Sequence, residues 1–432
     1  MKLHRSALAV AIFAAILAPT LASGAGYAIY EQGAAVLGMA GAGTASVHDA
    51  SAVFYNPAAL VTLDGKSAYF GGTWLSTHNS FAGVDPNPGF GVTEKMKTGN
   101  FFPPTVYWTN RLSSKWAYGA GLNAPFGLGV DWENAESFTG RGRVTKASLQ
   151  GINANLSLAY ALSPKLSIGL GFDALFAGVE VNQIATQVIP GGGGGVANIA
   201  QVKLKGGLTP GYGFNTALQW RPNEKWKFGA AYRSKVEVDI TDGDATFTQM
   251  LTGDTLFDAV VAAGLPPAQG VSTTLKFPAI APVGGAWSPS PDWTWELDVN
   301  HTQWSLFNEL PITFSTTKSK NSVITENYED SWRVSVGAEH RLPGHTYRFG
   351  YYYDQEAAPI ESVTPLLPDA PRHGVTLGLG WTLGAKKQWT LDAYNLALFL
   401  ENRSTEGKER DGYNGTYKAY VNGTGLSLAY HW

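Results

Sequence analysis

Residues 226–240 separate into two faces when every second residue is taken. The even positions are almost all apolar, whereas every charged side chain of the stretch stands at an odd position. Side chains point to alternate faces along a β-strand, so this stretch predicts one long strand with one face in apolar surroundings. The same division recurs over residues 293–300 and 347–354. The chain is therefore predicted to be all-β, with strands that separate an apolar from a polar environment.

The composition indicates that this apolar environment is a membrane. Charged residues make up 15% of the chain, against about 25% in an average soluble protein. After the N-terminus there is no run of about 18 to 20 apolar residues, which a membrane helix needs. Because every backbone polar group must be satisfied within a bilayer, a closed β-barrel is the other structure able to span it.

The N-terminus has the pattern of a secretory signal peptide. A short charged region precedes an uninterrupted apolar stretch over residues 7–18, which Pro19 ends. Ala22 and Gly24 have the spacing that signal peptidase recognises, so residues 1–24 are predicted to be removed. A transmembrane anchor is the alternative, but the stretch is too short for one. An exported chain of this composition is expected in the outer membrane of a Gram-negative cell, surrounded by outer-membrane lipid and lipopolysaccharide.

Short turns between the alternating segments give the number of strands. Each turn is rich in Pro, Gly, Asn or Ser, which supply the backbone angles of tight turns. The turns are 111–115, 162–165, 221–225, 288–292, 342–345 and 384–387. Their spacing leaves room for two strands of about 10 residues and one longer loop on the other side. Six periplasmic turns separate seven hairpins, which predicts a fourteen-stranded antiparallel transmembrane β-barrel over residues 64–432.

The last residues of the chain fit the final strand of such a barrel. Leu426, Leu428, Tyr430 and Trp432 alternate with small or polar residues. A terminal aromatic residue on an amphipathic strand resembles the signal that the barrel-assembly machinery reads, so that machinery is an expected partner. We expect the folded protein to be a monomer.

Residues 25–63 precede the first strand and lack its alternation. The segment is rich in Gly and Ala and is too small to build a core of its own. We interpret it as a plug, or hatch, inside the barrel lumen. A mobile periplasmic tail is the alternative.

Several short motifs stand in order along the chain: Gly26-Tyr-Ala-Ile, Asn56-Pro57-Ala58, Ala124-Pro-Phe-Gly-Leu128, Ser157-Leu-Ala-Tyr160, Tyr232-Arg-Ser-Lys-Val236, Thr302-Gln-Trp-Ser305, Asp330-Ser-Trp-Arg333, and Pro368-Asp followed by Arg372-His373. With these motifs the chain resembles the FadL family of outer-membrane transporters for long-chain fatty acids and other hydrophobic compounds. The resemblance implies a hatch bearing Asn56, Pro57 and Ala58, and a kinked third strand that opens the wall sideways. It also implies passive uptake, in which extracellular loops capture a hydrophobic ligand and the ligand leaves laterally.

The chemistry of Pro125, Phe126 and Gly127 also favours such a kink, independently of the resemblance. Proline has no N–H to donate, so within a strand Pro125 removes one ladder hydrogen bond, and Gly127 adds flexibility beside it. The alternative is that Pro125 begins an extracellular loop.

Two long external loops are expected, the third over about 182–209 and the fourth over about 241–274. The glycine run 191–195 has no following Lys-Ser/Thr, so it is a loop tip rather than a phosphate-binding loop. The fourth loop contains a short helical pattern of apolar residues, and the resemblance implies that this loop captures the ligand: Leu256, Phe257, Val260, Val261 and Leu265. Packing against the neighbouring loop is the alternative explanation for these residues.

One departure from the family pattern concerns the ligand. Fatty-acid importers of this family are expected to meet the carboxylate with a basic pair, which by ungapped placement falls on Gln183 and Ile324. Neither residue carries a charge. The basic residues that could substitute are Arg141, Arg143, Lys203, Lys205 and Lys276. The departure favours the branch that imports neutral aromatic hydrocarbons or alkanes.

Other functions are less compatible with the sequence. His48, His78, His301 and His373 lack a neighbouring motif for a catalytic triad or metal site, so we predict no enzyme activity, no metal and no cofactor. The chain has no cysteine, which excludes disulfides, and its net charge of −3 gives no field for nucleic acid. A general polar porin remains a rival, although a plugged lumen argues against it.

Overall fold

The computed structural model describes residues 26–189, 195–318 and 321–432. The predicted signal peptide, Ala25 and most of the glycine run 191–195 lie outside the described residues.

Strands dominate the fold, and a few short helices precede or connect them. The strands are β1 (Lys66–Gly83), β2 (Thr93–Lys95), β3 (Gly99–Phe101), β4 (Pro104–Arg111), β5 (Trp116–Asp131), β6 (Lys146–Ser163), β7 (Leu166–Val188), β8 (Val196–Trp220), β9 (Trp226–Arg233), β10 (Val236–Gln249), β11 (Gln269–Phe277), β12 (Ile280–Ser290), β13 (Trp293–Thr302), β14 (Glu309–Phe314), β15 (Ser322–Thr325), β16 (Ser331–Leu342), β17 (His345–Asp354), β18 (Arg372–Leu383), β19 (Trp389–Leu400), β20 (Arg403–Ser404) and β21 (Gly415–His431). The helices are α2 (Ala34–Gly38), α3 (Ala52–Tyr55) and α4 (Thr255–Gly264), with 3₁₀ turns η1 (Pro57–Thr62), η2 (Trp304–Leu306) and η4 (Ile360–Ser362). No helix in the described ranges is long and apolar enough to cross a membrane.

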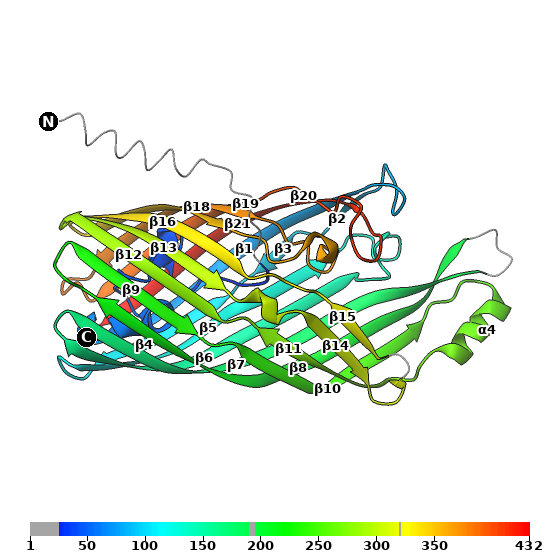
Figure 1. Ribbon diagram of the computed structural model, residues 1–432, viewed down its shortest axis with the longest axis horizontal. Helices are drawn as coiled ribbons and strands as arrows, with labels where there is room; N and C mark the ends of the chain where they lie inside the picture. The colour runs from blue at the N-terminus through cyan, green and yellow to red at the C-terminus, as the bar shows by residue number, and fades with distance from the viewer. Residues whose placement is uncertain (1–25, 190–194, 319–320) are drawn as a thin grey trace.

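The strands form a closed antiparallel barrel (Figure 1). Several barrel strands are interrupted, so that two or three short segments make one strand of the wall. Counted around the wall, the fourteen strands are β1, β2 to β4 together, β5, β6, β7, β8, β9 with β10, β11 with β12, β13 with β14, β15 with β16, β17, β18, β19 and β21. The wall closes where β1 pairs with β21, from Ser67 opposite His431 to Gly83 opposite Gly415. The predicted fourteen-stranded barrel is confirmed.

All six predicted turns join neighbouring strands, and the alternation behaves as expected. On β17, Tyr347 and Phe349 face outward and are exposed, whereas Arg348 between them is buried in the lumen. The apolar side chains, at every second position of the strands, therefore form the outer surface, which a membrane covers.

The two long loops are shorter than the sequence suggested. Most of residues 182–209 continues β7 and β8, whose pairing extends to Val188 opposite Val196. Much of 241–274 likewise belongs to β10, α4 and β11. The strands continue because β7, β8, β10 and β11 keep pairing with one another beyond the length that a bilayer requires, as the projecting end of the barrel shows (Figure 1).

The segment before β1 lies inside the barrel, seen as the blue trace within the wall in Figure 1. Helices α2 and α3 and turn η1 are almost entirely buried. The wall approaches this segment closely: a Cβ on Gly229 would come within 2.0 Å of the Thr44 carbonyl oxygen, and one on Gly337 within 2.5 Å of Met39. Glycine is required at such contacts because a side chain would displace the segment.

Candidate functional site

The Asn56-Pro57-Ala58 motif fixes the N-terminal segment to the wall. Asn56 caps η1, since its side-chain oxygen accepts a hydrogen bond from the Ala58 N–H at 3.0 Å. Its amide nitrogen donates to the carbonyls of Thr44 (2.6 Å) and of Leu218 on β8 (3.2 Å). The Ser167 hydroxyl of β7 donates to the Ala58 carbonyl at 2.8 Å. One motif therefore links the segment to itself and to two wall strands.

Two carboxylates on β13 hold the loop before α3. Asp298 accepts hydrogen bonds from the backbone N–H of Gly43 and from both the N–H and the hydroxyl of Thr44, at 2.7 to 3.0 Å. Glu296 accepts one from the Ala45 N–H at 2.6 Å. Donors that would be unsatisfied in the lumen are thus paired with the wall.

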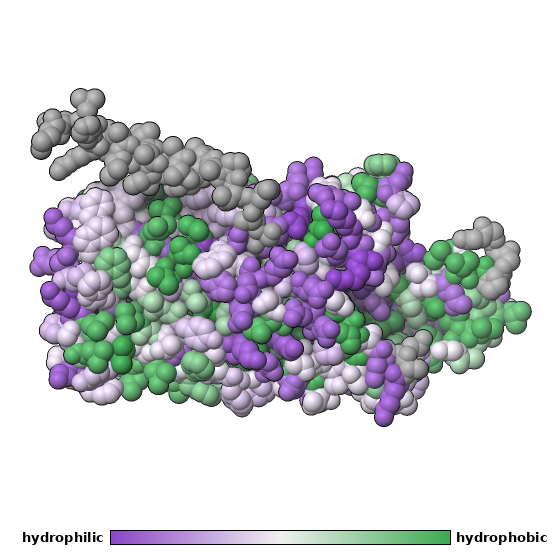
Figure 2. Space-filling view, in the orientation of Figure 1, coloured by the Kyte–Doolittle hydropathy of each residue, from purple (hydrophilic) through white to green (hydrophobic). Residues whose placement is uncertain are grey.

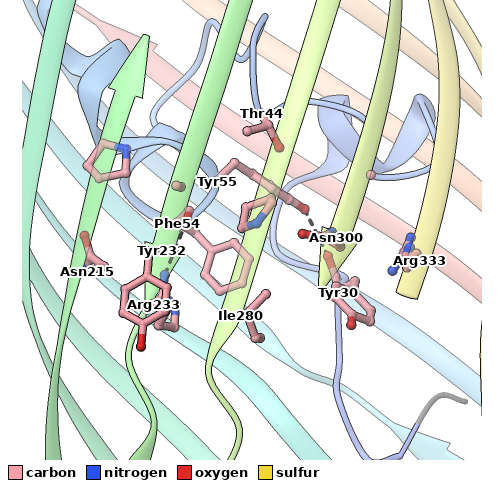
Figure 3. Close-up of a pocket in the computed structure, with 14 residues that line it drawn as sticks. Tyr30, Thr44, Phe54, Tyr55, Asn215, Tyr232, Arg233, Ile280, Asn300 and Arg333 are labelled. Atoms are coloured by element: carbon pink, nitrogen blue, oxygen red, sulfur yellow. Dashed lines mark hydrogen bonds between the residues drawn. The ribbon is translucent and has the colours of Figure 1, made fainter. Parts of the chain in front are cut away.

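A small cavity of about 50 Å³ lies beside this attachment (Figure 3). Arg233 reaches into it and pairs with Asp173 at 2.5 Å. Arg333, only 2% exposed, lies between the rings of Tyr30 (4.1 Å) and Tyr352 (3.8 Å). Such cation–π contacts stabilise a buried guanidinium. The cavity has room for a few waters at most, so it belongs to the attachment of the segment.

Strand β5 contains the predicted irregularity at Pro125. Its register with β6 shifts between Asn123 and Phe126: these two residues are three positions apart on β5, but their partners on β6 are only two positions apart. This is a β-bulge, which bends the strand that carries it. On the other side, the β4–β5 ladder ends at Val106 opposite Leu122 within the described chain. Pro125 thus lies inside the strand rather than at the start of a loop.

The N-terminal residues occupy the place that β4 vacates. The Ile29 N–H donates to the Pro125 carbonyl at 2.8 Å, and the Gly127 N–H donates to the Tyr27 carbonyl at 3.0 Å. Ala28 is therefore paired with Phe126 in a short antiparallel bridge. The chain's own N-terminal segment supplies a ladder partner to the kinked strand.

An aromatic cage anchors this short pairing. The Tyr27 ring contacts four others, those of Phe126, Phe277, Trp304 and Phe307, with centroids 4.7 to 6.1 Å apart. The Gly26 N–H donates to the Asp369 carboxylate at 3.0 Å. The same carboxylate accepts from the N–H groups of Ala357 and Ala358. The position of the N-terminal segment thus depends on residues from distant parts of the chain.

A cavity of about 480 Å³ lies along these residues and passes into the wall. Its inner lining includes Tyr27, Tyr352 and Leu398, and its outer lining includes Phe102 and Ile152, which are 70% and 36% exposed. The Phe101 ring lies directly against Gly129 in this lining, because a Cβ on Gly129 would come within 2.1 Å of it. The cavity therefore extends from the lumen to the lipid-facing surface beside β5.

The lining contains one basic and two acidic side chains. Arg372 is the cation among the lining residues, and it pairs with Asp354 at 2.8 Å. Two carboxylates, Glu31 and Asp369, also belong to the lining. The remaining surface is largely apolar and aromatic. Such a lining suits an uncharged hydrophobic molecule.

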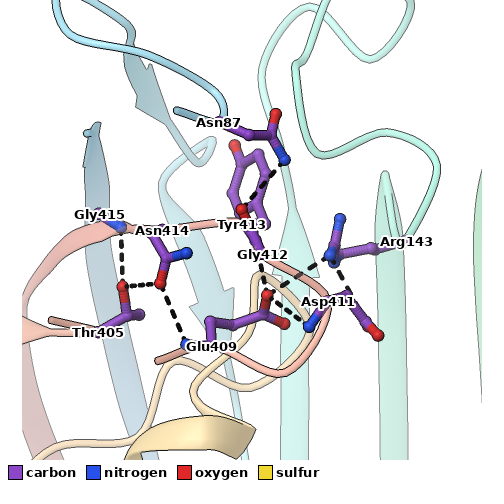
Figure 4. A network of polar contacts seen from close by, with 9 residues as sticks. All are labelled: Asn87, Arg143, Thr405, Glu409, Asp411, Gly412, Tyr413, Asn414 and Gly415. Carbon is purple, nitrogen blue, oxygen red and sulfur yellow. Dashed lines mark hydrogen bonds and ion pairs between the residues drawn. The ribbon is translucent and has the colours of Figure 1, made fainter. Parts of the chain in front are cut away.

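Above the cavity, an apolar layer and a polar clasp close the extracellular end. Trp132 and Phe138 stack at 4.4 Å in a buried cluster that includes Tyr413. Figure 4 shows the clasp, in which Arg143 pairs with Glu409 at 3.5 Å and lies over the Tyr413 ring. Burial raises the pKa of the Glu409 carboxyl, although Arg143 and the Tyr413 N–H act in the opposite direction. The clasp joins the loop after β5 to the loop before β21.

The predicted helix of the fourth loop exists as α4, at the projecting tip where apolar residues gather in Figure 2. Asp254 caps it by accepting from the N–H groups of Leu256 and Phe257. Phe257 and Val261 are buried, whereas Leu256 and Val260 are 77% and 62% exposed. Leu265 is the C-cap. The five residues are brought together, but they face in two directions.

Neither position expected to be basic lies at the large cavity. Gln183 is on β7 opposite Val202, and Ile324 is on β15, 37% exposed. Of the substitutes, Arg143 pairs with Glu409, and Lys203 pairs with Glu180 at 2.9 Å. None of the five proposed substitutes lines the 480 Å³ cavity.

The sequence did not predict the pairing of residues 27–29 with β5. It also did not predict the hydrogen bond from Gly26 to Asp369 or the position of Arg372 in the cavity lining. The motifs Gly26-Tyr-Ala-Ile and Pro368-Asp with Arg372-His373 stood out in the sequence, but they lie about 340 residues apart. No local pattern predicts which wall residue an N-terminal segment will contact.

A closed barrel with outward apolar faces, an internal N-terminal segment and a cavity in the wall defines an outer-membrane transport barrel. The chain belongs to the outer membrane protein transport protein family (OMPP1/FadL/TodX), whose model matches residues 15–432.

Individual relatives agree with this assignment over nearly their whole length. A long-chain fatty acid transport protein of Escherichia coli O6:H1 is 25% identical over 448 residues, covering 99% of this chain and 98% of the relative. The crystal structure of a Pseudomonas aeruginosa FadL homologue superposes with a TM-score of 0.81 at 20% identity, covering 94% of this chain and 100% of that chain. The toluene transporter TodX of P. putida gives 0.69 at 16% identity, covering 95% and 99%. At these identities the solved structures show the fold alone.

Proposed function

We propose that the protein is a passive channel for hydrophobic small molecules, and that its preferred cargo is uncharged, such as an aromatic hydrocarbon or an alkane. The observation that carries this proposal is the 480 Å³ cavity beside β5, whose lining is largely apolar and whose arginine is already paired with Asp354. Long-chain fatty acids are the second candidate, because a full-length relative carries that name.

The route runs from the projecting tip to the wall. The exposed residues Leu256 and Val260 of α4 provide the first apolar contact outside the cell. The molecule then reaches the cavity in the lumen and leaves sideways past Pro125, Phe126 and Gly127. A solute that leaves water gains roughly 0.8 kcal/mol per CH₂ group. Release into periplasmic water would forfeit that gain, whereas lateral exit into the membrane keeps it.

The N-terminal segment provides the gate. Residues 27–29 occupy the free edge of β5, so a molecule leaving by this route must separate them from Pro125 and Gly127. The hatch around Asn56, Pro57 and Ala58 keeps the rest of the lumen closed while this short pairing opens. The two backbone hydrogen bonds contribute about 1 kcal/mol each, and ligand binding must offset them together with any Tyr27 ring contacts that are lost.

A comparison of a long-chain fatty acid with its methyl ester tests the cargo. Both molecules bury the same chain, and only the acid needs a cationic partner in the lining. We expect the purified protein to bind the ester at least as tightly as the acid. If the free acid binds more than about tenfold tighter, a difference of roughly 1.4 kcal/mol, fatty acids become the preferred cargo. An Arg372→Gln variant then identifies the partner, since it lowers acid binding only if Arg372 meets the carboxylate.

A further inference from the structure

The lipid-facing surface carries an apolar groove of about 640 Å³ that crosses β5 to β9. Cross-strand pairing places one residue from each strand side by side along its floor. This row consists of Trp116, Tyr160, Ile168, Leu218 and Ala230. A second row begins at Leu158 and continues through Leu170, Thr216 and Tyr232. The groove is separate from the cavity beside β5, because no lining residue is shared.

Small side chains make this part of the wall concave. Ala230 stands at an outward position of β9 between the larger Phe228 and Tyr232. Thr216 stands between Phe214 and Leu218 on β8, and its hydroxyl turns back to donate to the Gly169 carbonyl at 3.1 Å. Trp116 and Tyr160, whose rings are 4.5 Å apart, close one end. The lining is mostly apolar and crosses five strands, as an acyl chain requires.

The groove lies next to the periplasmic turns. Trp116 is the first residue of β5, and Ile168 is the third of β7. At about 3.3 Å per residue, the lower end of the groove is within roughly 10 Å of the turns. This depth corresponds to the periplasmic leaflet of the outer membrane, which favours a phospholipid as its occupant.

The turns beneath the groove carry an excess of positive charge. Lys115, Lys165 and Lys225 are exposed in the three turns, and Glu224 is the acidic residue among them. Arg221 bridges two of these turns, because its N–H donates to the Lys165 carbonyl at 2.7 Å. Lysines at this level complement lipid phosphates.

We propose that this groove binds a glycerophospholipid of the periplasmic leaflet with a net negative headgroup. The acyl chain lies over Ala230 and Thr216, and Lys115, Lys165 and Lys225 meet the headgroup. This proposal depends on the barrel and its membrane and is independent of which compound the protein transports.

Native mass spectrometry of the purified protein with dioleoyl phosphatidylglycerol and dioleoyl phosphatidylcholine tests the proposal. The wild type is expected to retain several-fold more phosphatidylglycerol. Filling the groove with Ala230→Leu and Thr216→Leu should reduce retention of both lipids. Replacing the lysines (Lys115→Gln, Lys165→Gln, Lys225→Gln) should remove the preference for phosphatidylglycerol while leaving binding of phosphatidylcholine unchanged.

The opposite side of the barrel offers a matched control. Ala393 points outward on β19 between Leu379 and Leu426, and Lys386 and Lys387 lie in the turn below. Ala393→Leu with Lys386→Gln and Lys387→Gln should leave the preference intact, with heat-modifiable gel migration showing that every variant is folded. Equal lipid retention in the wild type and the groove-filled variant, or the same loss in the control variant, would overturn the proposal.

Discussion

Single polar side chains hold the N-terminal segment inside the barrel, and most of their partners are backbone groups. Asn56, Asp298 and Gln219 each bond to backbone atoms of this segment or of the wall. A hydrogen bond of this kind contributes about 1 kcal/mol net, but leaving one partner unsatisfied in the lumen costs about 1 to 3 kcal/mol. The segment is therefore sensitive to single substitutions that the barrel itself tolerates.

Asn56→Ala should loosen the segment without unfolding the wall. The substitution removes the cap of η1 and the bonds to the Thr44 and Leu218 carbonyls. We expect faster hydrogen exchange over residues 43–62 and unchanged heat-modifiable migration. Thr62→Ala serves as the control, because Thr62 makes one bond within η1 only. Equal exchange in Asn56→Ala and the wild type would show that the motif does not hold the segment.

The buried carboxyl of Glu326 should make the local stability of residues 325–330 depend on pH. Burial raises the pKa of its carboxyl from 4.5 to about 7, although Arg410 acts in the opposite direction. The folded state therefore binds this proton more tightly than the unfolded state, and the stability that it adds is lost as the pH rises through 7. We expect faster intrinsic-rate-corrected hydrogen exchange over residues 325–330 at pH 8 than at pH 5.5. Glu326→Gln should abolish the difference, and persistence of the difference in that variant would refute the assignment.

At the scale of elements, the kinked strand and the N-terminal segment act as one unit. β5 loses its β4 partner after Leu122 and gains Ile29 and Tyr27 as partners around Phe126. A Cβ on Gly127 would lie 2.7 Å from the end of the Ile29 side chain. A bulky residue at Gly127 would therefore disturb the segment as well as the strand. The effect of such a substitution on transport could not be assigned to the kink or to the segment.

An engineered disulfide between the N-terminal segment and β5 tests the role of the segment directly, because it can be formed and reduced in the same variant. Ala28 and Phe126 form a non-hydrogen-bonded antiparallel pair, in which Cα atoms lie about 4.5 Å apart, within the range for a disulfide. The natural chain has no cysteine, so Ala28→Cys with Phe126→Cys can form one defined bond. We expect uptake of a hydrophobic compound to fall at least about tenfold when the pair is oxidised and to recover on reduction. Undiminished uptake by the oxidised form would exclude this gate.

The sequence predicts the elements better than their contacts. The alternation and the six turns predicted the wall because both depend on neighbouring residues, and the spacing of the apolar residues 256–265 predicted α4 in the same way. The extended β7 and β8 were underestimated because their outer parts pair with each other outside the membrane and lose the regular alternation. The bridge between Ala28 and Phe126 joins residues almost 100 positions apart, so no local rule could predict it.

For the whole molecule, the packed N-terminal segment should limit conduction of polar solutes. The lumen beside β13 is occupied by the loop bound to Asp298 and Glu296, and the extracellular end is closed by the clasp at Arg143 and Glu409. We expect planar-bilayer recordings of the purified protein to lack large steady conductance steps. Such steps in the wild type would instead support the polar porin. An Asp298→Ala variant, in which three bonds to the loop are lost, should show intermittent openings.

The length of β7 and β8 sets how far from the cell the protein first meets a solute. These strands have 23 and 25 residues, whereas crossing the bilayer takes about 10. Because barrel strands are tilted by about 45°, the remaining part of β7 adds roughly 30 Å of height, comparable with the hydrated sugar coat of a Gram-negative cell. Hydrophobic molecules cross that coat slowly because it is strongly polar. If α4 is the first binding site, as proposed above, its height lets the protein bind hydrophobic molecules at the outer face of this coat, before they have to cross it.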